Sequence, residues 1–125
     1  MTGLYLAQGY NNVFFSKPRS MARFGLLMLN KGNWNGTQII NDSLYFKKMV
    51  NSSSEQNPSY GYLWWLNGKS AYMAPGLQLK FNGMISPHAP TDMYAAMGKN
   101  GQLINVVPSK KMVVVRVGNA PDGTE

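Results

Sequence analysis

The chain lacks cysteine, has one histidine and carries few acidic residues, with 5 Asp and Glu against 12 Lys and Arg among its 125 residues. Without cysteine there is neither a disulfide nor a cysteine nucleophile, and one histidine cannot assemble a zinc site of the usual Cys and His type. The histidine, His88, stands between Pro87 and Pro90 and is interpreted as a loop residue. The sequence therefore predicts no metal and no cofactor.

Long apolar runs are also missing. No stretch approaches the roughly 20 apolar residues that a membrane-spanning helix needs. No basic segment followed by an apolar stretch marks a signal peptide near Met1. The sequence thus predicts no membrane span and no signal peptide in this chain, and it leaves the compartment open, because exported proteins can lack cysteine too.

The formal net charge is +7, and the basic residues are scattered as single residues or as the pairs Lys47-Lys48 and Lys110-Lys111. No run of five or six like charges occurs, so binding to nucleic acid is a disfavoured alternative. A second interpretation is that acidic partners lie elsewhere, since a piece of a domain need not be charge-balanced by itself.

The last third of the chain contains three apolar runs separated by turn signals. The runs are Met93–Met97, Gln102–Val107 and Met112–Val117. The first turn, Gly98–Gly101, holds two glycines and an asparagine that tolerate positive φ, and the second, Pro108–Lys111, begins with proline. This pattern predicts an antiparallel three-stranded meander.

Two helices are predicted upstream of the meander. The first begins at Ser16-Lys17-Pro18, with serine as cap, and ends near Asn30 before the stop residue Gly32. Its apolar surface is wide, so burial on more than one side is expected. The second is capped by Asn41-Asp42-Ser43 and ends near Val50. Its expected inward residues are Leu44, Tyr45, Met49 and Val50.

The remaining segments complete the predicted fold. Met1–Phe15 reads as an irregular, packed connection, and Tyr60–Leu66 as an aromatic strand. Lys69–Asp92, with its prolines and glycines, reads as a long irregular excursion that marks a binding loop or mobility. The predicted fold class is α+β, with an antiparallel sheet of the meander and the aromatic strand covered by helices.

Motifs for covalent or nucleotide chemistry are absent. No Gly-x-Ser-x-Gly elbow, no phosphate-binding Gly-x-x-x-x-Gly-Lys loop and no Gly-x-Gly-x-x-Gly occurs. No serine has a lysine three residues later. The chain alone therefore contains no nucleophile with an adjacent base, which covalent catalysis requires.

Five pieces of the sequence occur in an order that is recognisable. They are Ser20–Gly32 (SMARFGLLMLNKG), Trp34-Asn35-Gly36, Tyr60–Trp65 (YGYLWW), Gly98-x-x-Gly101-Gln102, and a strand ending at Pro108 before Met112–Val115. Together they resemble the C-terminal part of the β-lactamase-related serine hydrolases, a superfamily that includes penicillin-binding proteins, class C β-lactamases, esterases and 6-aminohexanoate-dimer hydrolases. The resemblance covers about Met1 to Asn119.

The resemblance implies three catalytic motifs, of which the first, Ser-x-x-Lys, is absent here. A literal Tyr-x-Asn stands at Tyr10-Asn11-Asn12, but the second motif of the family lies well upstream of the helix that begins near Ser16, so Tyr10 is interpreted as packing. Residues 1–125 are therefore predicted to be the C-terminal portion of the hydrolase domain, a partial β-lactamase/transpeptidase-like fold without the region that bears the nucleophile. Such a piece is expected to be inactive alone.

The third motif has two registers, Lys99-Asn100-Gly101 and Ala96-Met97-Gly98, and the second is favoured. In that register the resemblance implies that Gly98 ends a strand and that the Lys99 backbone N–H is an oxyanion donor. The expected substrate-contacting residues are Ala96, Met97, Asn100, Gly101 and Gln102. Alanine at position 96, in place of a basic or histidine side chain, favours an esterase or amidase. The alternative is that Gly98–Gly101 is only a hairpin turn.

The partners that the resemblance implies are a small amide or ester substrate and the missing N-terminal region of the same domain. A homodimer through exposed apolar surface is a further option, and the family suggests a periplasmic or exported protein. Loops within Trp64–Asp92 and the side chains of Trp34, Trp64 and Trp65 are candidates for the substrate cleft, with core packing expected for at least two of the tryptophans. The competing hypothesis is a stand-alone, non-catalytic binding module.

Overall fold

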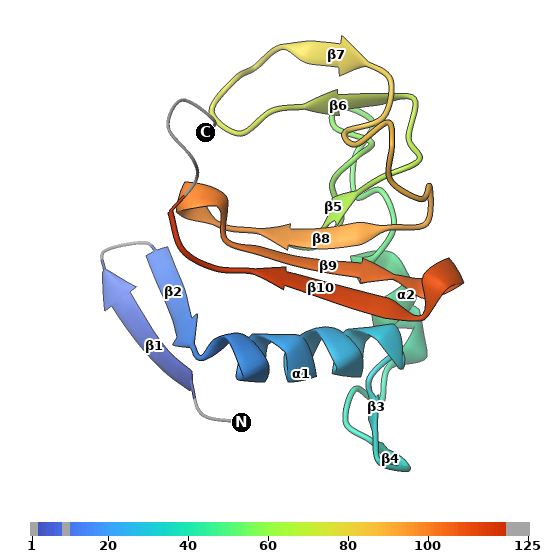
Figure 1. The fold of residues 1–125 in the computed structure, drawn as a ribbon. Coiled ribbons are helices and arrows are strands. Elements are labelled where there is room, and N and C mark those ends of the chain that lie inside the picture. The colour runs from blue at the N-terminus through green and yellow to red at the C-terminus, as the bar shows by residue number, and fades with distance from the viewer. Residues whose placement is uncertain (1–2, 9–10, 120–125) are drawn as a thin grey trace.

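A computed structural model describes residues 3–8 and 11–119, with the surroundings of side chains described from Phe15 onward (Figure 1). Tyr10 lies outside the described residues. Two helices and several short hairpins surround one four-stranded sheet. The α+β fold class with an antiparallel sheet is confirmed.

The main sheet is the predicted meander with one short strand added. Its order is β10-β9-β8-β5, and every neighbouring pair is antiparallel. The strands are β5 (Trp65–Leu66), β8 (Tyr94–Met97), β9 (Leu103–Val107) and β10 (Met112–Arg116). The two turns form where glycine, asparagine and proline predicted them. Asn100 (φ 61°) and Gly101 (φ 72°) take the left-handed conformation in the first turn, as does Lys111 (φ 49°) in the second.

Helix α1 (Pro18–Leu29) lies against β9 and β10 (Figure 1). Proline occupies its first turn, but the N-cap residue is Lys17 and not the expected Ser16, which belongs to a strand. Its apolar surface is buried in large part, since Met28 is 1% exposed and Phe24 and Leu29 pack against the core, whereas Leu26 is 41% exposed.

Helix α2 (Ser43–Met49) begins as predicted, with the Asp42 carboxylate accepting a hydrogen bond from the Tyr45 backbone N–H at 2.8 Å. The expected inward residues were partly wrong. Leu44 and Tyr45 are 71% and 49% exposed, whereas Phe46 is 7% exposed. A helix of two turns presents one narrow face, and Phe46, Met49 and Val50 share it at the i, i+3, i+4 spacing.

The hydrophobic core lies between α1, α2 and the sheet. Its buried members are Met28, Phe46, Trp64, Leu66, Tyr94 and Val106. The Trp64 ring stacks on Phe24 with centroids 6.1 Å apart and meets Tyr94 edge to face at 5.2 Å. The core therefore joins both helices to β5, β8 and β9.

Two segments that were expected to be irregular form hairpins in the structure. The N-terminal connection forms a hairpin of β1 (Gly3–Gln8) and β2 (Asn11–Ser16). The excursion between residues 69 and 92 contains a second hairpin, β6 (Ala71–Met73) and β7 (Lys80–Asn82), in which Tyr72 stacks on Phe81. Cross-strand aromatic pairs stabilise such short strands despite the prolines and glycines between them.

The turn at Asn35-Gly36 also closes a small hairpin, of β3 (Asn33–Trp34) and β4 (Thr37–Gln38). Both turn residues have positive φ, as Asn-Gly hairpins require.

Candidate functional site

The strand that carries the predicted site, β8, is paired along its whole length on one side only. On that side its partners in β9 run from Tyr94↔Val106 to Met97↔Leu103, and the Gly98 N–H donates to the Gln102 carbonyl at 2.8 Å. On the other side β5 pairs with Tyr94 and Ala95 alone. Among the described residues no strand lies beside Ala96–Gly98, so this stretch is an open sheet edge.

The edge is open because the chain turns away from it before β5 begins. The pairing of Trp65 with Ala95 would place residue 63 opposite Met97. Leu63 instead has φ 65° and is 80% exposed. The Gly61 N–H donates to the Trp64 carbonyl at 2.8 Å, and Tyr60 bridges to Trp65, so the segment folds back on itself as a tight turn. The predicted aromatic strand Tyr60–Leu66 is therefore wrong except at Trp65–Leu66.

The ladder also tells which backbone groups face the open side. The Gly98 N–H donates to the carbonyl of Gln102, the residue before β9, and in an antiparallel strand the hydrogen-bonding direction alternates from residue to residue. Ala96 therefore directs its N–H and C=O to β9, and Met97 directs its own to the open side. Gly98 is also extended, with φ −105° and ψ 172°. The alternation therefore continues, and the Lys99 N–H faces the open side.

An open pocket of about 390 Å³ adjoins this edge. Four of the predicted site residues line it: Ala96, Met97, Gly98 and Gln102. Aromatic and aliphatic side chains form much of the remaining wall, among them Tyr60 and Trp65, whose rings meet edge to face at 4.8 Å. None of the described residues that line the pocket carries a formal charge. The site can therefore hold an uncharged, partly apolar group beside a free backbone edge.

The other predicted residues do not line this pocket. Lys99, Asn100 and Gly101 form the turn that follows β8, so the Lys99-Asn100-Gly101 triplet stands in the turn and the Ala96-Met97-Gly98 triplet on the strand. The Gly101 carbonyl accepts a bond from the Arg116 guanidinium at 2.6 Å.

Gln102 reaches the pocket from the other end of the turn and is also tied to the chain after β10. Its side-chain amide donates to the Gly118 carbonyl at 2.6 Å, and its side-chain oxygen accepts from the Gly118 N–H at 3.2 Å. These bonds fix the turn against the end of β10.

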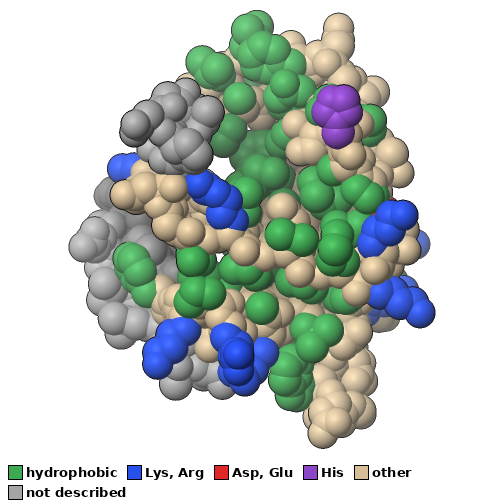
Figure 2. All heavy atoms as spheres, viewed as in Figure 1, with side chains coloured by type: hydrophobic (Ala, Val, Ile, Leu, Met, Phe, Trp, Pro, Cys, Tyr) green, Lys and Arg blue, Asp and Glu red, His purple; other side chains and the backbone are tan. Residues whose placement is uncertain are grey.

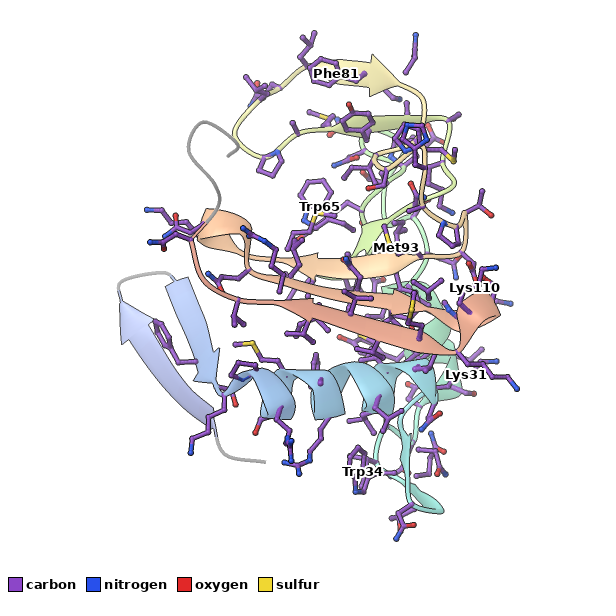
Figure 3. All side chains as sticks on the ribbon, viewed as in Figure 1. Lys31, Trp34, Trp65, Phe81, Met93 and Lys110 are labelled. Atoms are coloured by element: carbon purple, nitrogen blue, oxygen red, sulfur yellow. The ribbon has the colours of Figure 1, made fainter. Side chains whose placement is uncertain are left out.

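The three tryptophans have three different surroundings. Trp65 lines the pocket and projects from β5 toward the β6–β7 hairpin (Figure 3). Trp64 is 4% exposed in the core. Trp34 lines a separate groove of about 250 Å³ beside Arg23 and Ile39. Sequence reasoning missed Leu63 as a pocket residue, because a left-handed leucine carries no turn signature.

Asn67 anchors the loop that follows the pocket wall. It is 4% exposed, and its side-chain N–H₂ donates to the carbonyls of Ser86 at 2.9 Å, Pro90 at 3.0 Å and Ala89 at 3.2 Å. Its side-chain oxygen accepts from the Ser86 N–H at 3.0 Å. The proline-rich loop is thus held to β5 by one side chain.

Tyr94 lies at the start of β8, at the other end of the strand from Gly98. Burial, and next the negative charge of Asp92, raise the pKa of the Tyr94 phenol above its usual range. Among the described residues, no group of three His, Cys, Asp or Glu side chains lies close enough together to hold a metal ion.

The chain is similar to a solved hydrolase structure. A putative 6-aminohexanoate-dimer hydrolase from Bacillus anthracis superposes with a TM-score of 0.55 at 28% sequence identity, covering 83% of this chain and 23% of that chain. No protein-family model matches. In the described part of the chain, neither helix has the length and apolar character needed to cross a membrane.

A curated relative shows the same partial coverage. An uncharacterized protein of Alkalihalophilus pseudofirmus is 26% identical over 121 residues, which is 90% of this chain and 32% of that protein. The chain thus spans less than a third of the solved chain, at 23%, and about a third of the curated relative, at 32%. The likeness to the Bacillus hydrolase supports a relation of this chain to the β-lactamase-like hydrolases.

Proposed function

We propose that this chain is the C-terminal portion of a β-lactamase-related serine hydrolase that cleaves an ester or amide through an acyl-enzyme. The observation that carries the proposal is the open edge of β8 at Ala96–Gly98, which lies beside an uncharged pocket. The likeness to a putative 6-aminohexanoate-dimer hydrolase, a name that denotes an amide substrate, supports this reaction class.

In the proposed reaction the substrate lies extended along β8. An amide of the substrate pairs with the outward N–H and C=O of Met97, as an added strand would, whereas an ester can only accept from the N–H. The Lys99 N–H donates to the carbonyl oxygen that becomes negative, and the N–H of the attacking serine is the second donor. Gly98 bears no side chain, which leaves room for the substrate to approach the strand.

The nucleophile comes from sequence that this chain does not contain. A serine assisted by lysine and tyrosine would attack the carbonyl carbon, its proton passing through the base to the leaving alcohol or amine. Water would then attack the acyl-enzyme, release the acid and restore the serine proton. The 125-residue chain supplies the edge, one oxyanion donor and the pocket wall, so it is inactive by itself.

The uncharged pocket favours a neutral acyl group. Ala96 offers no cation to a substrate carboxylate, and Trp65, Met21 and Leu63 offer apolar contact. A carboxylate would lose its hydration there without gaining a partner. A neutral ester or amide is therefore the proposed substrate class.

A second candidate is a stand-alone binding module. The open edge and the adjoining pocket favour it, because together they can take up an extended peptide by strand addition without any chemistry. The two functions differ in one respect: only the hydrolase gains turnover when a nucleophile is supplied.

The deciding experiment uses a chromogenic butyrate ester and a fluorophosphonate probe. The chain alone should show neither turnover above buffer nor covalent labelling. Co-expression with the region of the Bacillus anthracis hydrolase that lies outside the match should restore both, and replacing the serine that the probe labels by alanine should abolish both. Labelling of the isolated chain would overturn the fragment proposal, and binding of extended peptides without turnover in the reassembled protein would favour the module.

A further inference from the structure

The turn that follows β8 is closed by the backbone of one residue, Gln102. The Gly98 N–H donates to the Gln102 carbonyl at 2.8 Å. The Gln102 N–H donates to the Lys99 carbonyl at 3.4 Å, which is longer than the usual range of about 2.7–3.2 Å. Gln102 thus bonds both to the residue before Lys99 and to Lys99 itself, but the second of these bonds is weak.

The side chain of Gln102 ties the same turn to the segment after β10. Its Nε2 donates to the Gly118 carbonyl at 2.6 Å, and its Oε1 accepts from the Gly118 N–H at 3.2 Å. One side-chain amide therefore exchanges two hydrogen bonds with one residue, as directly opposed residues do in an antiparallel ladder. Two bonds from a planar group fix both the position and the orientation of the Gln102 side chain.

Arg116 makes a second connection between the two segments. Its guanidinium donates to the Gly101 carbonyl at 2.6 Å and to the Asn119 carbonyl at 3.0 Å. Hydrogen bonds from a charged donor are about twice as strong as neutral ones. Strand β10, which ends at Arg116, lies at the front of Figure 1, and on the described part of the same face in Figure 2 no Asp or Glu side chain is visible. No carboxylate visible there draws the guanidinium away from the turn.

Gly118 can pair with Gln102 because of its backbone conformation. Its φ is 102°, a value that residues with a side chain rarely adopt. Among the described residues, no heavy atom outside its chain neighbours lies within 4 Å of a Cβ placed on Gly118. A side chain at this position would therefore strain the backbone without a steric clash, and would reorient the N–H and C=O that Gln102 holds.

These connections decide where the Lys99 N–H points. The peptide that carries it joins Gly98 to Lys99, and both of these residues bond to the backbone of Gln102. A donor to a developing oxyanion has to lie within about 2.7–3.1 Å of that oxygen. A misplacement of about 1 Å can cost about 10²-fold in rate. A turn whose own bond is weak therefore needs a tie from outside to keep this donor in place.

We propose that Gln102 is a positioning residue, which holds the Lys99 N–H toward the substrate carbonyl through its paired hydrogen bonds to Gly118, with Arg116 as a second tie. This inference rests on the proposed hydrolase function. It gives the Gln102 side chain a role inside the protein instead of the substrate contact that the sequence predicted.

The first test uses the hydrolase reassembled with its nucleophile region and a chromogenic butyrate ester. Gln102→Met keeps the length of the side chain and removes both bonds to Gly118. It should lower kcat about tenfold and leave KM within about twofold, because the donor that it displaces acts on the charge of the transition state. A raised KM with an unchanged kcat would show that Gln102 contacts the substrate, and would overturn the proposal.

Gln102→Glu adds a pH-dependent form of the same test. Its carboxylate can accept from the Gly118 N–H but cannot donate to the Gly118 carbonyl, whereas the protonated carboxyl can do both. The ratio of its kcat to that of wild type should therefore rise as the pH falls from 8 toward 5, in the direction of the ordinary glutamate pKa of about 4.3. A ratio that stays constant over this range would contradict the role of the paired bonds.

A matched pair of glycine variants separates positioning from stability. Gly118 and Gly36 both have positive φ, at 102° and 83°, and neither has a heavy atom within 4 Å of an added Cβ. Gly36 belongs to the β3–β4 hairpin, far from the turn after β8 (Figure 1). Both alanine variants should lower the urea midpoint by similar amounts, but only Gly118→Ala should lower kcat, by about tenfold. An equal loss of kcat in both would overturn the proposal.

The 125-residue chain alone tests the geometric step. In ¹⁵N relaxation, the order parameter of the Lys99 amide should be about 0.85 in wild type and below about 0.6 in Gln102→Met. An unchanged order parameter would contradict the positioning role. If the reassembled wild type turns over no ester, the proposed function is wrong and this role is wrong with it. Turnover that Gln102→Met leaves unchanged would overturn this inference alone.

Discussion

Gly25 on α1 lies in direct contact with Val113 on β10. A Cβ atom placed on Gly25 would stand 2.5 Å from Val113 Cγ1 and 3.0 Å from Ile104 Cγ2. The missing side chain is what lets the helix approach the sheet closely. We expect Gly25→Ala to lower the free energy of unfolding by about 1 kcal/mol, because overpacking costs about 1–3 kcal/mol and exceeds the gain of about 1 kcal/mol in helix propensity. Urea denaturation followed by tryptophan fluorescence measures this change.

The control for that prediction removes the partner. In the Val113→Ala background the steric conflict disappears, and Gly25→Ala should then be neutral or stabilising. A double-mutant cycle in which the two effects add without coupling would contradict the contact.

Tyr94 makes the free energy of unfolding depend on pH in alkaline solution. Its hydroxyl donates to the Met28 carbonyl at 2.9 Å, and burial raises the pKa of the phenol above its usual range. In the unfolded chain the same phenol titrates near pH 10, at about its ordinary pKa. Its neutral form is therefore favoured by folding, so the contribution is complete below about pH 10. Above that pH, stability should fall by about 1.4 kcal/mol per pH unit until the folded pKa is reached.

The matched variant is Tyr94→Phe, which keeps the ring and removes the titrating group. Near pH 7 it should cost about 1 kcal/mol, because the Met28 carbonyl loses the Tyr94 hydroxyl and keeps the Lys31 N–H at 3.0 Å. Denaturation curves at pH 9 and at pH 11 should show that the difference between wild type and variant shrinks on going to pH 11. A constant difference would show that Tyr94 is not the linked group.

The hydrogen bonds of Asn67 predict that this side chain anchors the loop from Ser86 to Pro90. Asn67→Ala removes four hydrogen bonds from a buried site and should cost about 2–4 kcal/mol, leaving backbone groups of the loop unpaired. Limited proteolysis should then cut the loop first. Asn82→Ala on the exposed strand β7 is the matched control and should lie within about 0.5 kcal/mol of wild type. Equal proteolysis of both variants would contradict the anchoring role.

The three-stranded meander was predictable from the sequence because each of its turn and strand signals is local. The turns are specified by the backbone preferences of Asn100, Gly101 and Pro108. The valines of β9 and β10 favour strands because β-branched side chains fit an extended backbone. The start of β5 was not predictable, because Leu63 adopts a left-handed conformation through contacts of its turn with distant backbone. One such contact is the Tyr62 N–H donating to the Met49 carbonyl at 3.0 Å.

The candidate site was also predictable from the sequence in part. Ala96, Met97 and Gly98 were expected on a strand end, and the strand pairing places them at the open edge. Trp65 was a candidate for the substrate cleft and lines the pocket, whereas Tyr60 was not expected there, since its position depends on the turn at Leu63. The positions of Lys99, Asn100 and Gly101 in the turn follow from the left-handed Asn100, which no longer continues a strand. Whether any of these residues contacts a substrate stays a prediction.

The sharpest test of the proposed oxyanion donor separates the Lys99 backbone from its side chain. Lys99 is the first residue of a one-turn helix after an extended Gly98, a position that proline tolerates without loss of the fold. In a hydrolase reassembled with its nucleophile region, Lys99→Pro should lower kcat by about 10²–10³-fold, because one donor to the developing oxyanion is removed. Lys99→Ala keeps the N–H and should retain activity within about threefold. Denaturation of both variants serves as the control for folding, and a loss with Lys99→Ala equal to that with Lys99→Pro would assign the role to the ammonium group.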